Sequence, residues 1–244
     1  MAIVKGIEKN NNSIAAIPCF NNARFIGQVV KSAQNHVSQV VVIDDGSSDD
    51  TGKIAELNGA SIVRHNLNKG YGAAIQSCFN VAKSSNAIVL VTLDGDGQHD
   101  PDDIPGILAP IVNGDADMVI GSRFIRQHNT VPAYRKLGIS VISFLWNVGS
   151  KTKISDTQSG FRAYNRRLIE GLSITENGMS VSIELLENAR RIGAIIEEVP
   201  ASCSYDHSTF GLKAIKQGVK VALAVIRIRS KNRRWLPVTS LINK

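Results

Sequence analysis

The residues best suited to chemistry follow the apolar run 88–93 and are Asp94, Asp96 and Gln98. The run is short and rich in β-branched residues, which predicts a buried strand rather than a membrane span. Because residues two apart in an extended segment point the same way, the three side chains would share one side. Neighbouring carboxylates repel unless a cation or a proton lies between them, and oxygen ligands of this kind suit Mg²⁺ or Mn²⁺. The alternative is an acidic, solvated turn after a core strand.

Short apolar runs alternate with segments of helical spacing along the chain. This alternation predicts an α/β fold with a mostly parallel central sheet and helices on both faces. Such sheets bind ligands beyond the carboxyl ends of their strands, and polar clusters follow the predicted strands there. The predicted strands are 14–17, 40–43, 61–64, 88–93, 117–120 and 195–199, and the predicted helices include 23–36, 137–148, 180–192 and 212–230.

The chain has 244 residues, enough for one large α/β domain. Its three cysteines, Cys19, Cys78 and Cys203, lack the spacing of metal ligands, so we expect reduced, mostly buried thiols in a cytosolic protein. Residues 1–13 are polar and unlike a signal peptide. No apolar run reaches the roughly 18 residues that a membrane-spanning helix needs.

Positive charge is concentrated at the C-terminus. Residues 207–244 hold nine Lys or Arg and no Asp or Glu, whereas the whole chain has a net charge of +7. A nucleic-acid-binding protein would spread its basic residues over the fold, so we expect no nucleic-acid partner. An apolar helix with basic edges, followed by Arg234 and Trp235, suits the surface of an anionic membrane through 212–236. The alternative is an ordinary solvated helix whose apolar face packs on the core.

Six motifs occur in order along the chain. They are Ile17-Pro18-Cys19-Phe20-Asn21, Val42-Ile43-Asp44-Asp45-Gly46-Ser47, Lys69-Gly70-Tyr71-Gly72, Asp94-Gly95-Asp96-Gly97-Gln98-His99, Gly121-Ser122-Arg123-Phe124 and Asp156-Thr157-Gln158-Ser159-Gly160-Phe161-Arg162. The set resembles family 2 glycosyltransferases of the GT-A fold, and the last two motifs resemble the dolichyl-phosphate mannose synthase and polyprenyl-phosphate glycosyltransferase branch. The resemblance implies a single Rossmann-like GT-A domain over 14–206, between a polar tail (1–13) and a basic amphipathic segment (207–244).

The resemblance implies that a GDP- or UDP-sugar donor binds across the strand ends with Mg²⁺ or Mn²⁺. Asp96 and Gln98 would hold the metal on the diphosphate, and Asp94, a third candidate ligand, would lie nearer the ribose or sugar. The other implied donor contacts are Pro18, Phe20 and Asn22 around the nucleoside, Asp44 or Asp45 on the base or ribose, and Lys69 and Gly70. The last two residues could equally form a simple turn before a helix.

The same resemblance places Arg123 on a phosphate, and Asp156 and Arg162 in a loop on the acceptor side. The chain departs from the family at two places. Asn22 stands where the family usually has an acidic residue. The segment 204–213 lacks the family's Arg and Ser-Lys pair, and Lys213 is its nearest substitute cation.

The chemistry of the acceptor decides which residues are needed. A lipid phosphate is already ionised near neutral pH and needs no base, but it needs cations, for which the candidates are Arg123, Arg135, Arg162 and Lys213. A hydroxyl acceptor needs a carboxylate base, for which Asp156 is the first choice. Simpler roles are a surface ion pair for Arg123, a turn for Asp156 and an exposed helix position for Glu184.

We therefore expect an enzyme that carries out metal-dependent, inverting transfer of a hexose from a nucleotide-diphosphate sugar to a polyprenyl (dolichyl) phosphate. It would act as a peripheral protein on the cytoplasmic face of a membrane. One alternative is transfer to a saccharide or protein hydroxyl. Another is a non-catalytic nucleotide-binding module, supported only by the altered segment 204–213. A dinucleotide oxidoreductase is disfavoured because no Gly-x-Gly-x-x-Gly follows the first predicted strand.

Overall fold

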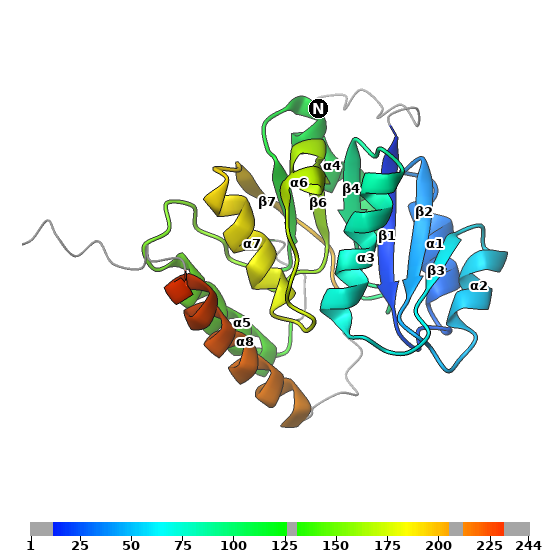
Figure 1. The fold of residues 1–244 in the computed structure, drawn as a ribbon. Coiled ribbons are helices and arrows are strands. Elements are labelled where there is room, and N and C mark those ends of the chain that lie inside the picture. Colours follow the sequence, from blue (N-terminus) through cyan, green and yellow to red (C-terminus); the bar gives the residue numbers. More distant parts are fainter. Residues whose placement is uncertain (1–11, 126–130, 205–211, 232–244) are drawn as a thin grey trace, which may run out of the picture.

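A single sheet with the strand order β3-β2-β1-β4-β6-β5-β7 forms the centre of the computed structural model (Figure 1). The structure describes residues 12–125, 131–204 and 212–231, and within the last range the side chains of 218–230. The strands of this part are β1 (Ser13–Cys19), β2 (Gln39–Asp44), β3 (Ser61–Arg64), β4 (Val89–Thr92), β5 (Met118–Ser122), β6 (Arg162–Asn165) and β7 (Ile196–Pro200).

The sheet is mostly parallel, as predicted, but it contains one strand that the sequence did not reveal. Neighbouring strands pair in parallel except where β6 lies antiparallel between β4 and β5. The resemblance implied that Arg162 lies in a loop on the acceptor side, and no strand was predicted over Arg162–Asn165. Its position between two buried strands, which also buries Tyr164, makes this short polar segment a central strand.

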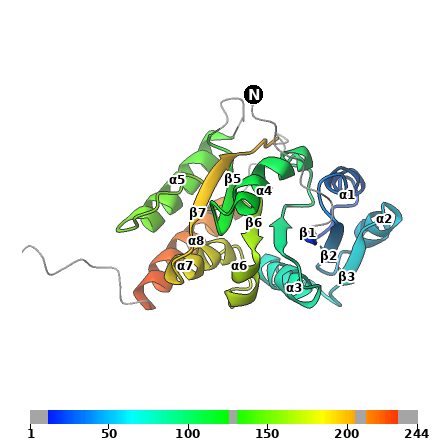
Figure 2. The same ribbon diagram turned by 90° about the horizontal axis from the view of Figure 1, so that it is seen from above.

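Helices cover both faces of the sheet (Figure 2). Alternate residues of β1 point to opposite faces. Ala15 and Ile17 join one core with α1 and α4, whereas Ile14 and Ala16 join the other with α3, α6 and α7. The helices are α1 (Ile26–Ala33), α2 (Thr51–Leu57), α3 (Tyr71–Ser84), α4 (Ile104–Asn113), α5 (Ala133–Asn147), α6 (Arg166–Gly171), α7 (Val181–Arg191) and α8 (Leu212–Lys231), with a short 3₁₀ helix, η1 (Pro101–Asp103), before α4.

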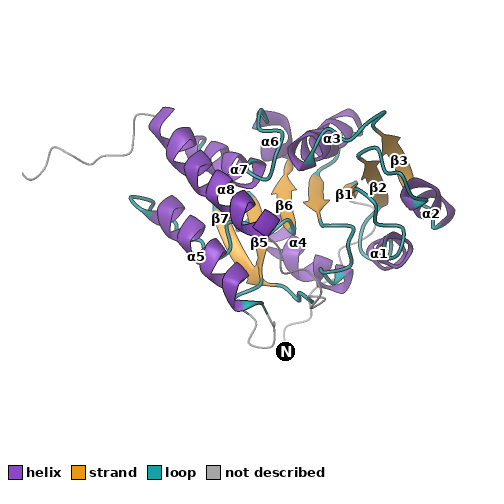
Figure 3. Cartoon of the chain, turned by 90° about the horizontal axis from the view of Figure 1, so that it is seen from below, coloured by secondary structure: helices purple, strands orange, loops and turns teal. Residues whose placement is uncertain are grey.

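Helices α5 and α8 lie side by side at one end of the molecule (Figure 3). Val221 and Val225 of α8 belong to the core that α5 and α7 share. The buried guanidinium of Arg229 donates hydrogen bonds to the carbonyl oxygens of Leu145, Trp146 and Val148, where α5 ends. Because the last carbonyls of a helix have no partner within it, this arginine caps α5 and fixes α8 against it.

The cysteines agree with the prediction, since Cys19, Cys78 and Cys203 are free and buried. Burial raises the pKa of the Cys19 and Cys78 thiols, so both stay protonated near neutral pH. Among the described helices, none combines the length and the hydrophobicity needed to cross a bilayer.

Candidate functional site

The turn after β4 carries the two carboxylates and the amide that the sequence singled out. The backbone N–H of Gln98 donates to Asp96 Oδ1 at 3.0 Å, and Gly97 adopts φ +74° to close this turn. Burial and the neighbouring Asp94 raise the pKa of Asp96. A carboxylate whose charge is disfavoured in this way would be stabilised by a cation. The described residues contain no cluster of three or more His, Cys, Asp or Glu that could hold a metal ion.

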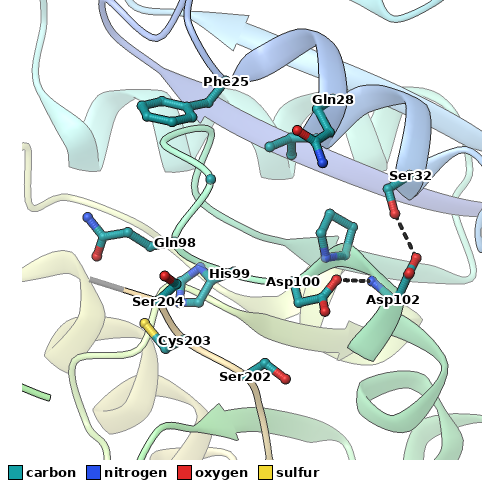
Figure 4. Close-up of a pocket in the computed structure, with 13 residues that line it drawn as sticks. Phe25, Gln28, Ser32, Gln98, His99, Asp100, Asp102, Ser202, Cys203 and Ser204 are labelled. Atoms are coloured by element: carbon teal, nitrogen blue, oxygen red, sulfur yellow. Dashed lines mark hydrogen bonds between the residues drawn. The ribbon is translucent and has the colours of Figure 1, made fainter. Parts of the chain in front are cut away.

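A cleft of about 560 Å³ opens between α1 and the segment that follows β7, lined by Gln98 of this turn but by neither Asp94 nor Asp96 (Figure 4). Phe25 and Gln28 of the α1 side face His99 and Ser204 across it, next to Gln98. The backbone N–H of Ser204 donates to the Gln98 carbonyl at 2.9 Å, and His99 pairs with Cys203 as an isolated bridge. The segment after β7 therefore fixes the backbone of the turn.

Asp94 has partners that the sequence did not identify. The phenol of Tyr71 donates to Asp94 Oδ1 at 3.1 Å, and His99 Nδ1 lies 3.6 Å from Oδ2. Burial and the Asp94 charge raise the pKa of Tyr71, so this phenol remains a donor at neutral pH. The sequence places Tyr71 in the Lys69-Gly70-Tyr71-Gly72 motif and suggests no role for its hydroxyl. No local signal shows that its hydroxyl reaches a residue 23 positions away.

Hydrogen bonds join the loop after β1 to the loop after β2. Asn21 accepts from the Ser48 backbone and its own N–H donates to Ser47 Oγ, at 2.9 and 3.0 Å. Asn22 accepts the Phe20 N–H at 3.0 Å, and the Phe20 ring is exposed. Pro18 is buried within β1. Of the three predicted nucleoside contacts, Phe20 and Asn22 follow β1 and the Phe20 ring is open to a ligand, whereas Pro18 is buried inside the strand.

Asp44 and Asp45 differ from the prediction, because both are buried and bonded within the protein. Asp45 accepts from the backbone N–H groups of Lys69 and Gly70, at 2.9 and 2.8 Å, and lies 2.6 Å from His65. Asp44 accepts the Ser47 N–H at 2.8 Å. These hydrogen bonds hold the loops at the strand ends in place.

Arg123 and Asp156 were expected to contact substrate, but the structure pairs them with each other. Arg123 Nε lies 2.6 Å from Asp156 Oδ2, and a terminal nitrogen lies 2.6 Å from Oδ1. The carboxylate is fully buried, and Glu198 accepts the Asp156 N–H. A general base must reach the proton that it removes, and in this structure both carboxylate oxygens of Asp156 are bonded to Arg123. The ion pair expected for Arg123 is present but largely buried rather than on the surface, and Asp156 directly precedes a turn.

Arg162 also departs from its expected contact with the acceptor. Its buried guanidinium donates to the carbonyl oxygens of Ser159, Ser182 and Thr157, at 2.7, 3.0 and 2.7 Å. These bonds direct the guanidinium into the protein, where it ties the loop before β6 to α7. The charge is therefore turned away from the acceptor side.

The order of polar clusters along the strand ends, with two carboxylates and an amide after β4, is matched by one family model. The Glycosyl transferase family 2 model matches residues 14–172, which is more than half of the chain. The chain belongs to this family. It is therefore a glycosyltransferase, and the GT-A-like α/β fold expected from its motifs is the fold observed.

Two relatives of this family 2 glycosyltransferase have informative names. The UDP-N-acetylglucosamine–dolichyl-phosphate N-acetylglucosaminyltransferase of Methanococcus voltae is 32% identical over 211 residues, covering 78% of this chain and 84% of the relative. The polyprenol monophosphomannose synthase of Mycolicibacterium smegmatis is 32% identical over 212 residues, covering 80% and 78%. These names agree with the predicted resemblance to the polyprenyl-phosphate branch.

Solved structures share the fold at lower identity. Glucosyl-3-phosphoglycerate synthase from Mycobacterium tuberculosis, crystallised with Mn²⁺, UDP and phosphoglyceric acid, superposes with a TM-score of 0.71. The alignment covers 90% of this chain and 78% of that one at 19% identity. At this identity the likeness establishes the fold alone.

The remaining predicted site residues of the glycosyltransferase lie around the same edge or on α5 and α8. Lys69 is exposed, and Gly70 takes φ +98°, a conformation that favours glycine. Arg135 lies in the first turns of α5, where its Nε is 3.3 Å from the Tyr134 hydroxyl. The side chain of Lys213 lies outside the described residues, as do 205–211.

A loop between α6 and α7 completes the surroundings of the α3 N-terminus. Asn177 accepts the Gly72 N–H at 2.9 Å, and Arg227 of α8 pairs with Glu176. The prediction of an exposed Glu184 is wrong, because this residue is buried and accepts the N–H groups of Thr175 and Glu176, both at 2.9 Å. Buried carboxylates need such partners, so Glu184 holds the loop in place.

Proposed function

We propose that this family 2 glycosyltransferase moves a hexose from a UDP- or GDP-sugar to a polyprenyl phosphate, with inversion at the anomeric carbon. The observation that carries the donor side is the turn of Asp94, Asp96 and Gln98, which lies at the carboxyl end of β4 beside an open cleft. A nucleotide diphosphate bound there would meet backbone and side chains from several strand ends at once.

The donor set of this turn fits Mg²⁺ or Mn²⁺. Asp96 and Gln98 would hold the ion through oxygen atoms, with Asp94 next to them, and the diphosphate oxygens would complete its coordination. The pKa of Asp96 is raised because its ionised form is disfavoured, and a bound cation would stabilise that form. When bound, a divalent cation neutralises the charge that develops on the departing diphosphate.

An ionised phosphate acceptor needs no catalytic base from the protein. One of its oxygens forms a bond to the anomeric carbon while the bond from that carbon to the diphosphate breaks, and the nucleoside diphosphate leaves with the electron pair. No proton has to be removed, which agrees with the enclosure of Asp156 by Arg123. Similarity to relatives named for dolichyl-phosphate and polyprenol products supports the same acceptor class.

Fewer than the four predicted cations remain as candidates for binding the acceptor phosphate. The guanidinium groups of Arg123 and Arg162 point to Asp156 and to buried carbonyl oxygens. We therefore assign acceptor binding to the other two predicted cations, Arg135, which is also bonded to Tyr134, and Lys213. The first lies near the start of α5 and the second near the start of α8. Because the two helices pack together, both cations belong to the same helix pair.

A membrane surface is the setting that we propose for this helix pair. Both helices expose large apolar side chains, which we call the apolar surface: Leu137, Val141 and Phe144 of α5, and Val219, Leu223 and Ile226 of α8. Exposed Lys220 adds positive charge beside them. Apolar side chains with basic neighbours suit the interface of an anionic bilayer, where a lipid-linked acceptor is found. We propose a peripheral association with the cytoplasmic face.

Transfer from donor to lipid tests the proposal directly. Purified full-length protein is incubated with MnCl₂ or MgCl₂, labelled UDP- and GDP-sugars in turn, and a short polyprenyl phosphate. Label that enters the organic phase supports the proposal. Label that stays in water with every donor, although UDP or GDP binds, contradicts the lipid acceptor. Label on an added saccharide would instead indicate a hydroxyl acceptor.

A further inference from the structure

The Asp94 carboxylate is enclosed on three sides. The Tyr71 hydroxyl donates to Oδ1 at 3.1 Å, and His99 Nδ1 lies 3.6 Å from Oδ2. Gly160 closes the third side, since a Cβ there would lie 2.7 Å from both carboxylate oxygens and 2.8 Å from the Tyr71 oxygen. The Asp94 side chain is nevertheless 32% exposed, so one side remains open to a ligand.

The position of the Tyr71 hydroxyl is fixed by contacts at the start of α3. Gly72 donates its N–H to Asn177 at 2.9 Å, and a Cβ on Gly72 would lie 1.9 Å from the Glu176 carbonyl oxygen. The loop that makes these contacts is itself held by buried Glu184. The Tyr71 ring packs against the core on the same side of the sheet. Two segments distant in sequence therefore set where the phenol points.

We propose that Tyr71 is a positioning residue for donor binding, which acts by holding Asp94 in the orientation that meets the nucleotide sugar. The inference rests on the proposed donor role of the turn from Asp94 to Gln98. Without the hydroxyl, the carboxylate gains other rotamers, and the donor has to reorder it on binding. Tyr71 thus contributes to donor affinity without touching the donor.

A double-mutant cycle on nucleotide binding separates this role from a general effect on the fold. Calorimetric titration with UDP and with GDP, each with MnCl₂ and without acceptor, is carried out on wild type, Tyr71→Phe, Asp94→Asn and the double variant. We expect Tyr71→Phe to weaken binding roughly three- to ten-fold, as for loss of one hydrogen bond. We expect no further weakening when Tyr71→Phe is added to Asp94→Asn.

Tyr164→Phe is the matched control, because it removes a buried phenol hydroxyl that bonds Arg162 and Thr92 instead of Asp94. Its nucleotide affinity should stay within about two-fold of wild type. An equal loss in Tyr164→Phe and Tyr71→Phe would overturn the inference, and so would full additivity in the double variant. Gly160→Ala is a second variant that displaces the same carboxylate, so unchanged affinity in folded Gly160→Ala would also count against it.

The outcomes distinguish this inference from the proposed function. If Asp94→Asn weakens binding and Tyr71→Phe does not, the inference fails and the donor site stands. If Asp94→Asn binds as wild type does, or wild type binds neither nucleotide, the donor role of Asp94 fails and the inference fails with it. Urea unfolding of each variant shows that the altered affinities belong to folded protein.

Discussion

Arg123 binds both carboxylate oxygens of the buried Asp156, with two nitrogen–oxygen distances of 2.6 Å. The two residues come from β5's C-terminal end and from the segment before β6, 33 positions apart. A buried pair of this kind links the two segments, and loss of either partner leaves an uncompensated charge.

Asp156→Asn should therefore destabilise the protein by about 3 kcal/mol, because it leaves Arg123 without its counter-charge. Urea unfolding followed by circular dichroism measures the change. Asp115→Asn, at an exposed position after α4, is the control and should stay within about 0.5 kcal/mol of wild type. Unchanged stability together with lost transfer in Asp156→Asn would restore its role as a base.

Asp96→Asn should abolish metal-dependent transfer, with a loss of at least about a hundred-fold, because it removes the carboxylate assigned to the cation. The same change should stabilise the metal-free protein at pH 7. The pKa of Asp96 is raised above its ordinary value of 3.8, so its ionised form opposes folding at neutral pH.

The stability gained by Asp96→Asn over wild type should increase from low pH to neutral pH. Below the ordinary pKa the carboxyl is protonated in both states and the penalty is absent; it develops as pH rises through the raised pKa of the folded state. Urea midpoints of wild type and Asp96→Asn should thus converge at low pH and separate at neutral pH, in buffer with EDTA. A variant less stable than wild type at pH 7 would contradict the assigned electrostatics.

Gly72→Ala should destabilise the protein by about 2 kcal/mol or more, because the new Cβ would lie 1.9 Å from the Glu176 carbonyl oxygen. Gly106→Ala is a matched control in α4, where no atom lies within 4 Å of the added Cβ. Alanine is the better helix former, so this control should be neutral or stabilise by up to about 1 kcal/mol. Thermal unfolding compares the two, and equal effects would argue against close packing of α3 on the 174–178 loop.

Leu223→Asp should reduce flotation with anionic vesicles several-fold, because it places a charge within the apolar surface of α8. Leu57→Asp is the control, since Leu57 is also an exposed helical leucine but lies on α2. Point substitutions are preferable to truncation at residue 212, which would remove Val221 and Val225 from the core. Equal flotation of both variants and wild type would refute the membrane surface.

The sequence by itself determined the alternation of strands and helices and the edge of the sheet at which the proposed site lies. Apolar runs such as Val40-Val41-Val42-Ile43 have one stable placement, a strand buried on both faces, so their order predicts a parallel sheet. The polar residues that follow these runs must then gather at one edge. This logic located the turn from Asp94 to Gln98 before any contact was known.

Only the tertiary structure decided which polar residues are available to a ligand. Asp45, Arg123, Asp156 and Arg162 have the composition of site residues, yet each is bonded to protein groups. Tyr71 shows the opposite case. Its residue type is typical of a core, yet its hydroxyl donates a hydrogen bond to Asp94. Partners of a charged side chain come from segments far along the chain, and a buried charge is tolerated only where they meet it. Local sequence fixes the type of a side chain, whereas packing between distant segments fixes its partner.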